Sequence, residues 1–280
     1  MRWLCVLLVL GCGRGPEPQA GPTRLISLTP SATEVIAALG ATPLLVGVDD
    51  YSDVPAEVQQ LPKVGSFLAP NLEIIVALRP SLVIVDDVHS QSAGALHDAG
   101  VATLECPMHG LPDIKSALRA VGQRLGKSAE AETVITGIEH AMDAAIAQRP
   151  ARRPRVLAII DREAGGLGNL VAAGTGSWVD ELLAVTGGEN VLAAAGVRYP
   201  KISAEEVLRA RPDVILDLSY AAKDGVAAWS ALDIPAVAAH HVVGLFDPLL
   251  IRPTPRVAEA LALLARSLQG PALPDRAAPP

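Results

Sequence analysis

The chain has 280 residues, of which 50% are hydrophobic and only 3% are aromatic, and its formal net charge is -7. This length allows two modest domains with cores built mainly from Ala, Val, Leu and Ile. The acidic balance, with no basic cluster larger than residues 151–155, argues against nucleic acid and anionic lipid as main partners and favours a basic surface on another protein.

The first residues have the form of an export signal. One Arg precedes the apolar stretch 3–10, which is too short to span a bilayer as a helix. Residues 9–12 (VLGC) resemble a bacterial lipobox, in which the Cys is acylated and becomes the new N-terminus. We therefore expect a signal peptide over 1–11, a lipid on Cys12 and a flexible tether over 12–23. The alternative is a simple secretory signal whose cysteines have no role.

From residue 24 onward, apolar strands alternate with helices. RLISLT predicts a strand that Pro30 ends, and SATEVIAALG predicts a helix with a Ser31/Glu34 capping box and a stop at Gly40. Further strands are predicted in PLLVGVDD, SLVIVD and VATLEC, with helices in NLEIIVALRP and QSAGALHDAG. Strands that are apolar on both faces and alternate with helices indicate a covered parallel sheet. Residues 24–111 are therefore predicted to form one α/β lobe.

The strand signal disappears over residues 112–150. The segment SAEAETVITGIEHAMDAAIAQ has apolar residues at helical spacing, and about 20 helical residues span about 30 Å, enough to connect two lobes. The α/β pattern resumes over 151–270, from RVLAIID through WVDELLAVTGG and HVVGLF to TPRVAEALALLARSLQ, and 271–280 is expected to be a disordered tail. The predicted fold class is α/β, with two lobes that contain parallel sheets and are joined by a single long α-helix.

One helix–strand unit occurs twice. NLEIIVALRPSLVIVD begins at Asn71, and SAEEVLRARPDVILDL begins 132 residues later at Ser203, so that Glu73 matches Glu205. Each Glu occupies the second helical position, where a carboxylate stabilises the positive end of the helix dipole by roughly 0.3–1 kcal/mol. That effect accounts for one Glu. Two matched, exposed carboxylates on paired lobes can also bind basic residues of a partner.

Catalytic and metal-binding signatures are not recognisable in the sequence. GGLG at 165–168 and GTG at 174–176 fit neither the Walker nor the dinucleotide-binding pattern and are interpreted as turns. The histidines, including His89 and the pair His240 and His241, lack partners at metal-ligand spacing. No Ser-His-Asp or paired-carboxylate arrangement can be assigned. We therefore predict no enzymatic activity, no metal site and no cofactor.

Six segments resemble, in order and spacing, the substrate-binding proteins of ABC importers for cobalamin and ferric siderophores, and the cobalamin-binding members most of all. They are RLISLTPSATEVIAALG, VGVDDYSDVP, VGSFLAPNLEIIVALRPSLVIV, GGENVL, YPKISAEEVLRARPDVIL and TPRVAEALALLARSL, and the match covers nearly all of residues 24–269. The resemblance implies a class III periplasmic binding protein, with the ligand held between two lobes that close only slightly. It also implies a monomeric, lipid-anchored receptor in the periplasm or at the cell surface.

Roles for individual residues follow from the resemblance. Glu73 and Glu205 match the carboxylates that dock such proteins onto arginines of the membrane permease. Five residues match positions of the ligand cleft: Tyr51, Phe67, Tyr199, Asp247 after a one-residue shift, and Arg252. Phe67 and Tyr199 replace tryptophans of the cobalamin binders, and Asp86 stands where a further tryptophan is expected. Cobalamin or a related corrinoid is the expected ligand.

Alternatives remain open. Haem would need an axial Tyr or His, for which Tyr51 and His89 are candidates, and a ferric siderophore would favour several cleft arginines, of which Arg252 is the strong candidate. An exported metal-binding protein or enzyme on the same scaffold would need clustered His, Glu or Asp in the cleft. The only hint of such a cluster is given by His240, His241 and Asp247.

Overall fold

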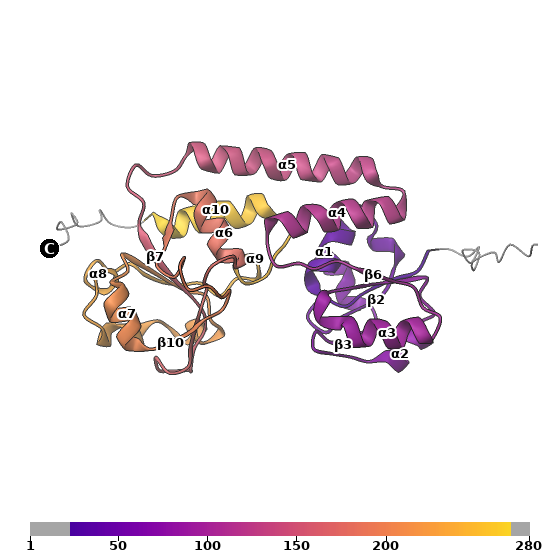
Figure 1. Cartoon of the computed structure of the whole chain (residues 1–280), viewed down its shortest axis with the longest axis horizontal. Helices are drawn as coiled ribbons and strands as arrows, with labels where there is room; N and C mark the ends of the chain where they lie inside the picture. The colour runs from indigo at the N-terminus through magenta and orange to yellow at the C-terminus, as the bar shows by residue number, and fades with distance from the viewer. Residues whose placement is uncertain (1–22, 270–280) are drawn as a thin grey trace, which may run out of the picture.

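The computed structural model describes residues 23–269 as two lobes side by side, with one long helix running along both (Figure 1). The expected signal peptide, the lipid-bearing Cys12, the tether up to residue 22 and the C-terminal tail lie outside the described residues. Within the described part, the predicted α/β class with two lobes joined by a long helix is confirmed.

The N-terminal lobe contains a parallel four-stranded sheet. Its strand order is β2 (Leu45–Val48), β1 (Leu25–Ser27), β5 (Leu82–Val85) and β6 (Thr103–Glu105). Alternate strand residues face opposite sides, so Leu25 packs with helices α1 (Pro30–Ala38) and α4 (Leu111–Leu125), whereas Ile26 packs with α2 (Leu72–Ala77) and α3 (Ser90–Asp98). Both faces are covered, as the continuous apolar strands predict. A short hairpin, β3 (Gly65–Ser66) and β4 (Ala69–Pro70), precedes α2.

The C-terminal lobe contains a mixed sheet. Its main path is β10 (Lys201–Ile202), β8 (Leu170–Ala172), β7 (Arg155–Asp161), β11 (Val214–Asp217) and β12 (Val242–Gly244), and β9 (Glu189–Asn190) pairs with β7. The central strands are parallel as predicted, but β8 and β10 add antiparallel pairs. The reason is the short link from β7 to β8, which contains GGLG and is long enough only for a hairpin. GGLG therefore forms a turn, as expected.

The long helix is α5 (Ser128–Ala147), which packs on α4 in one lobe and on α6 (Trp178–Thr186) and α10 (Val257–Leu268) in the other. The residues just before it form α4, which the sequence pattern did not resolve from a linker. Two short helices, α8 (Pro235–Ala238) and α9 (Pro248–Ile251), flank β12. The connection between the lobes is thus a layer of helices and not one isolated strut (Figure 1).

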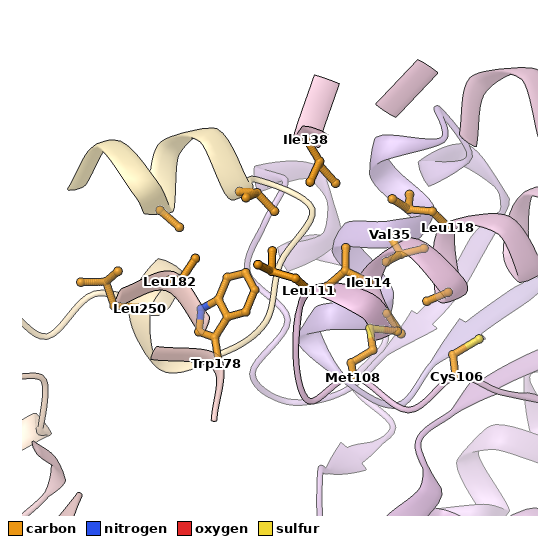
Figure 2. Packing of buried hydrophobic residues seen from close by; sticks show 14 of the residues in the cluster. Val35, Cys106, Met108, Leu111, Ile114, Leu118, Ile138, Trp178, Leu182 and Leu250 are labelled. Atoms are coloured by element: carbon orange, nitrogen blue, oxygen red, sulfur yellow. The ribbon is translucent and has the colours of Figure 1, made fainter. Parts of the chain in front are cut away.

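One hydrophobic core runs through both lobes, and we call it the continuous core. It contains Val35 and Ile114 of the N-terminal lobe and Leu182 and Leu250 of the C-terminal lobe. Trp178, at the start of α6, lies between these two groups and is 1% exposed (Figure 2). Its indole Nε1 donates a hydrogen bond to the Leu249 carbonyl over 2.9 Å. Shared burial of this kind resists independent movement of the lobes.

Polar contacts between the lobes accompany this core. The N-cap of helix α1 is Thr29, two residues before the predicted Ser31, and Pro30 is in the first turn, so the expected Ser31/Glu34 capping box is wrong. Ser31 Oγ instead donates to the Pro253 carbonyl over 2.7 Å. The buried Glu34 carboxylate accepts a hydrogen bond from Thr254 and pairs with Arg256 over 2.8 Å. These hydrogen bonds and the ion pair stabilise the contact between the lobes.

The sequence repeat is also a structural repeat. Helix α2 leads into β5, and helix α7 (Ala204–Ala210) leads into β11, each in the middle of its parallel strand group. The matched pairs include the N-caps Asn71 and Ser203, the buried Ile75 and Val207, and the left-handed Arg79 and Arg211. Helices α2 and α7 lie on the same side of the molecule, opposite α5 (Figure 1). Glu73 and Glu205 are both exposed on these helices.

Candidate ligand-binding cleft

The aromatic residues divide into two groups. The described tryptophans, Trp178 and Trp229, are buried. All three tyrosines and both phenylalanines lie outside the strands and α-helices, and they are Tyr51, Phe67, Tyr199, Tyr220 and Phe246. The three tyrosines are 47% to 66% exposed. Large rings that are left accessible in a protein with so few of them indicate a recognition surface.

A cavity of about 520 Å³ lies between the lobes. Its lining includes charged side chains of both signs, with His109 and Asp113 from one lobe and Glu181 and Arg198 from the other. Glu181 also accepts a hydrogen bond from the Leu111 backbone N–H at 2.5 Å, which places this α6 carboxylate at the first turn of α4. The carboxylate is partly buried, which raises its pKa. None of the five predicted ligand residues lines this cavity.

Tyr51 and Arg252 lie close together across the lobe boundary. Arg252 follows α9, and its guanidinium donates to Asp53 Oδ1 over 2.7 Å and to the Tyr51 carbonyl over 3.4 Å. The same group lies 3.6 Å from Glu34. The Tyr51 ring itself is 63% exposed. The accessible Tyr51 ring therefore lies on the same part of the lobe boundary as the Arg252 guanidinium, which the carboxylates of Asp53 and Glu34 hold in place.

The other three predicted ligand residues are on separate loops. Phe67 is at the β3–β4 turn and meets the His89 ring edge-on, with centroids 5.3 Å apart. Tyr199 lies in the loop before β10. The Asp247 carboxylate caps α9 by accepting from the Leu249 N–H over 2.9 Å, which gives it a structural role.

A second aromatic group was missed from the sequence. Tyr220 follows β11, Phe246 follows β12, and their rings meet edge-on at 5.4 Å. Lys223 Nζ lies 4.3 Å from the Tyr220 centroid and 4.4 Å from the Phe246 centroid. The sequence did contain a signal for this group, because an aromatic residue within a few positions of the end of a parallel strand lies near the edge where ligands of α/β sheets bind.

His89 is not free to bind an iron. It is 3% exposed, its Nδ1 accepts a hydrogen bond from the Asp86 N–H over 2.9 Å, and its Nε2 contacts the Phe67 carbonyl at 2.6 Å. The hypothesis of an axial His89 is therefore wrong. The group of His240, His241 and Asp247 also fails as a cluster, because the histidines precede β12 and Asp247 follows it.

Two carboxyls and an imidazole do meet at the edge of the N-terminal sheet. Asp86 and Asp87 follow β5, and His109 follows the adjacent β6. Burial raises the pKa of Asp86 to about 6, and the nearby Asp87 carboxyl adds to this effect. Hydrogen bonds with Asp86 and then His109 lower the pKa of Asp87 to about 2. The two carboxyls therefore hold one proton between them over a range in which free aspartates would hold none.

Replacing Asp86 by Asn is expected to change how stability depends on pH. In the wild type, the raised pKa means that the native state holds a proton the unfolded chain releases, so the free energy of unfolding falls between about pH 4 and 6. Denaturant unfolding is measured at several pH values in metal-free buffer. The free energy of unfolding should fall between about pH 4 and 6 in the wild type but not in the Asp86→Asn variant. His109, which faces Asp87, is present in both proteins and so does not account for the change. A difference in unfolding free energy between wild type and variant that is the same at every pH would contradict the expectation.

Two lobes with a continuous core, an intervening cavity and accessible aromatic rings form the architecture of a two-lobed protein for binding small molecules. Residues 25–248 match the family described as periplasmic binding protein, and the chain belongs to this family. Among the described residues, no helix combines the length and apolar character that crossing a bilayer requires.

Similar proteins include both corrinoid and haem binders. A vitamin B12-binding protein of Vibrio parahaemolyticus is 28% identical over 242 residues, covering 85% of this chain and 86% of the relative. The solved periplasmic vitamin B12-binding protein of Vibrio cholerae is 27% identical with a TM-score of 0.70, covering 88% and 96%. The solved apo form of a periplasmic haem-binding protein from Roseiflexus sp. RS-1 is 30% identical with a TM-score of 0.76, covering 88% and 98%.

Proposed function

We propose that this chain is the extracytoplasmic substrate-binding component of an ABC importer and captures cobalamin or a related corrinoid between its lobes. The main support for this ligand class is that all the tyrosines and phenylalanines lie outside the strands and α-helices, and that the three tyrosines are exposed. Such rings match the broad apolar surface of a macrocycle. The corrinoid is favoured by the curated relatives, which are named vitamin B12-binding proteins.

Capture requires no chemical step. The exposed rings of Tyr51, Tyr199 and Tyr220 remove apolar ligand surface from water, and Arg252 and the charged cavity wall orient polar substituents. The continuous core holds the two binding surfaces in register, so little ordering is needed when the ligand binds. Release at the membrane then depends on the permease.

Haem is the second candidate. The three exposed phenols are possible axial ligands, and one of the solved neighbours binds haem. His89 gives no support to this alternative, because both of its ring nitrogens contact the backbone. A ferric siderophore is less well supported, because the guanidinium of Arg252 is already engaged by Asp53.

Calorimetric titration distinguishes these ligands. The protein from residue 23 onward is titrated separately with cyanocobalamin, haemin and a ferric hydroxamate siderophore, with absorption spectra recorded in parallel. We expect one equivalent of cobalamin to bind and the other two to bind weakly or not at all. Tight binding of haemin with a shifted Soret band, or of the siderophore alone, would show that the corrinoid proposal is wrong.

Replacing Tyr220 by Ala is expected to weaken ligand binding by roughly 30-fold. If the ring buries about 80 Å² against the ligand, its loss costs about 2 kcal/mol. The dissociation constant of the proposed ligand is measured by calorimetry. Leu208→Ala on α7 is the control, because it removes an exposed apolar side chain that does not line the interlobe cavity, and it should leave the affinity unchanged. Equal affinity of both variants would remove Tyr220 from the ligand site.

We further propose that Glu73 and Glu205 dock the loaded protein onto basic residues of the permease, and that a lipid on Cys12 keeps it at the membrane. The support for docking is that both carboxylates are exposed, occupy the same position in α2 and α7, and lie on one side of the molecule (Figure 1). The anchor rests on the VLGC segment at residues 9–12.

A further inference from the structure

The edge of the N-terminal sheet brings together three potential metal ligands. Asp86 and Asp87 follow β5 and His109 follows β6, and these neighbouring parallel strands end at the same edge. One ligand atom from each residue lies within 4.8 Å of the others. We call these three residues the Asp-Asp-His cluster.

One oxygen of this cluster is buried without a partner. Asp86 is 4% exposed, and its Oδ2 accepts a hydrogen bond from the Met108 N–H over 3.2 Å. Its Oδ1 is inaccessible to solvent and receives no hydrogen bond from any N–H or hydroxyl group of residues 23–269. A buried carboxylate oxygen left in this state is unfavourable by several kcal/mol in the absence of compensation. The arrangement therefore points to a group that binds there.

The charge of the cluster is also uncompensated. The Asp87 carboxyl lies beside that of Asp86, and its Oδ2 contacts His109 Nε2 at 2.9 Å. Among residues 23–269, no Lys or Arg forms an ion pair with either aspartate. Two carboxylates repel each other, and a single imidazole cannot neutralise both, so the cluster attracts a cation.

We propose that Asp86, Asp87 and His109 form a binding site for a divalent transition-metal cation such as Zn²⁺. Carboxylate oxygens and an imidazole nitrogen are ligands that suit Zn²⁺, and three protein ligands leave at least one coordination position open. The ion takes the place of a proton between His109 Nε2 and Asp87 and supplies the partner that Asp86 Oδ1 lacks.

Contacts around the cluster hold these ligands in place. The His89 ring accepts from the Asp86 N–H, and Asp113 Oδ2 accepts from the His109 N–H over 3.0 Å. Both bonds are donated by backbone N–H groups, so they fix the main chain from which the two ligand side chains extend. His109 and Asp113 also line the cavity between the lobes. An open coordination position would therefore face the interlobe space, where an anionic group of a bound molecule can reach it.

The test is a titration of the untagged full chain, treated with EDTA and dialysed, with ZnCl₂ followed by calorimetry. We expect one equivalent to bind, and Co²⁺ to give visible absorption bands of a site with mixed nitrogen and oxygen ligands. Asp86→Asn and His109→Gln should each weaken Zn²⁺ binding at least about 100-fold, the upper end of what loss of an outer-shell partner costs.

A matched control is available on the same lobe. His97 and Asp98 are adjacent, exposed residues on α3, and His97→Gln and Asp98→Asn should leave Zn²⁺ affinity unchanged. The proposal is overturned if wild type binds no Zn²⁺, if the cluster variants retain its affinity, or if the controls lose as much. Circular dichroism checks whether the Asp86→Asn variant folds. If it does not, the His109→Gln variant still tests the proposal, because His109 is partly exposed. This site lies within one lobe and does not depend on the identity of the organic ligand.

Discussion

Replacing Glu73 and Glu205 together by Lys is expected to abolish ligand uptake by cells while leaving the affinity of the purified protein for its ligand unchanged. The two carboxylates are exposed at the starts of α2 and α7, and neither lines the cavity between the lobes. The substitution turns an attraction to basic permease residues into repulsion at both contacts. The loss of the favourable dipole interaction costs only about 0.3–1 kcal/mol per helix, so the fold should be retained.

Uptake of labelled ligand in cells that depend on this protein measures the effect. The control is a double Lys variant at Glu130 and Glu139, which are exposed on α5 and carry the same change in charge on the opposite side of the molecule (Figure 1). Control cells should transport normally. Normal uptake by the Glu73 and Glu205 variant would refute docking through these residues, whereas reduced uptake by the control would point to a general effect of charge.

Arg162→Met is expected to destabilise the fold by about 3–5 kcal/mol, because it leaves the Asp217 carboxylate buried without its counter-charge. The two side chains are 1% and 0% exposed, and Arg162 Nε lies 2.6 Å from Asp217 Oδ2. The remaining guanidinium nitrogens donate to the carbonyls of Glu163, Gly166 and Gly225. Loss of this side chain therefore also loosens the loops that follow β7 and precede the Trp229 segment.

Chemical denaturation monitored by circular dichroism measures the change in unfolding free energy. Arg119→Met provides a matched control, because Arg119 pairs with Glu132 over 2.7 Å but both side chains are more than half exposed. Exposed pairs contribute at most about 1 kcal/mol, so this control should be nearly neutral. Equal destabilisation of the two variants would contradict the importance assigned to the buried pair.

Local patterns were sufficient for most of the fold. Apolar strands, helical spacing and N-caps such as Asn71 and Ser203 depend on neighbours in sequence, and these predictions hold in the structure. Ser31 and Glu34 could not be placed in this way. Their partners, Pro253 and Arg256, belong to the other lobe, and a contact across more than 200 residues leaves no periodic signal. The antiparallel β8 likewise depends on the length of one hairpin and not on strand composition.

Only those residues of the candidate site that match family motifs could be predicted from the sequence. Tyr51 and Arg252 were selected by alignment, and the structure brings them together across the lobes. Tyr220 and Phe246 were missed because each is a single aromatic residue after a strand and their contact follows from the pairing of β11 with β12. The Asp-Asp-His cluster was missed for the same reason, since β5 and β6 bring together residues from separate loops.

The continuous core has a consequence for transport. Because Trp178 and its neighbours pack the lobes into one unit, we expect the spacing between Glu73 and Glu205 to change little when the cleft fills or empties. A permease that recognised only these two carboxylates would therefore accept the empty protein almost as readily as the loaded one. Under the proposed docking, unloaded molecules would compete with loaded ones for the permease, and the import flux would depend on the ratio of loaded to unloaded protein as well as on the amount of ligand.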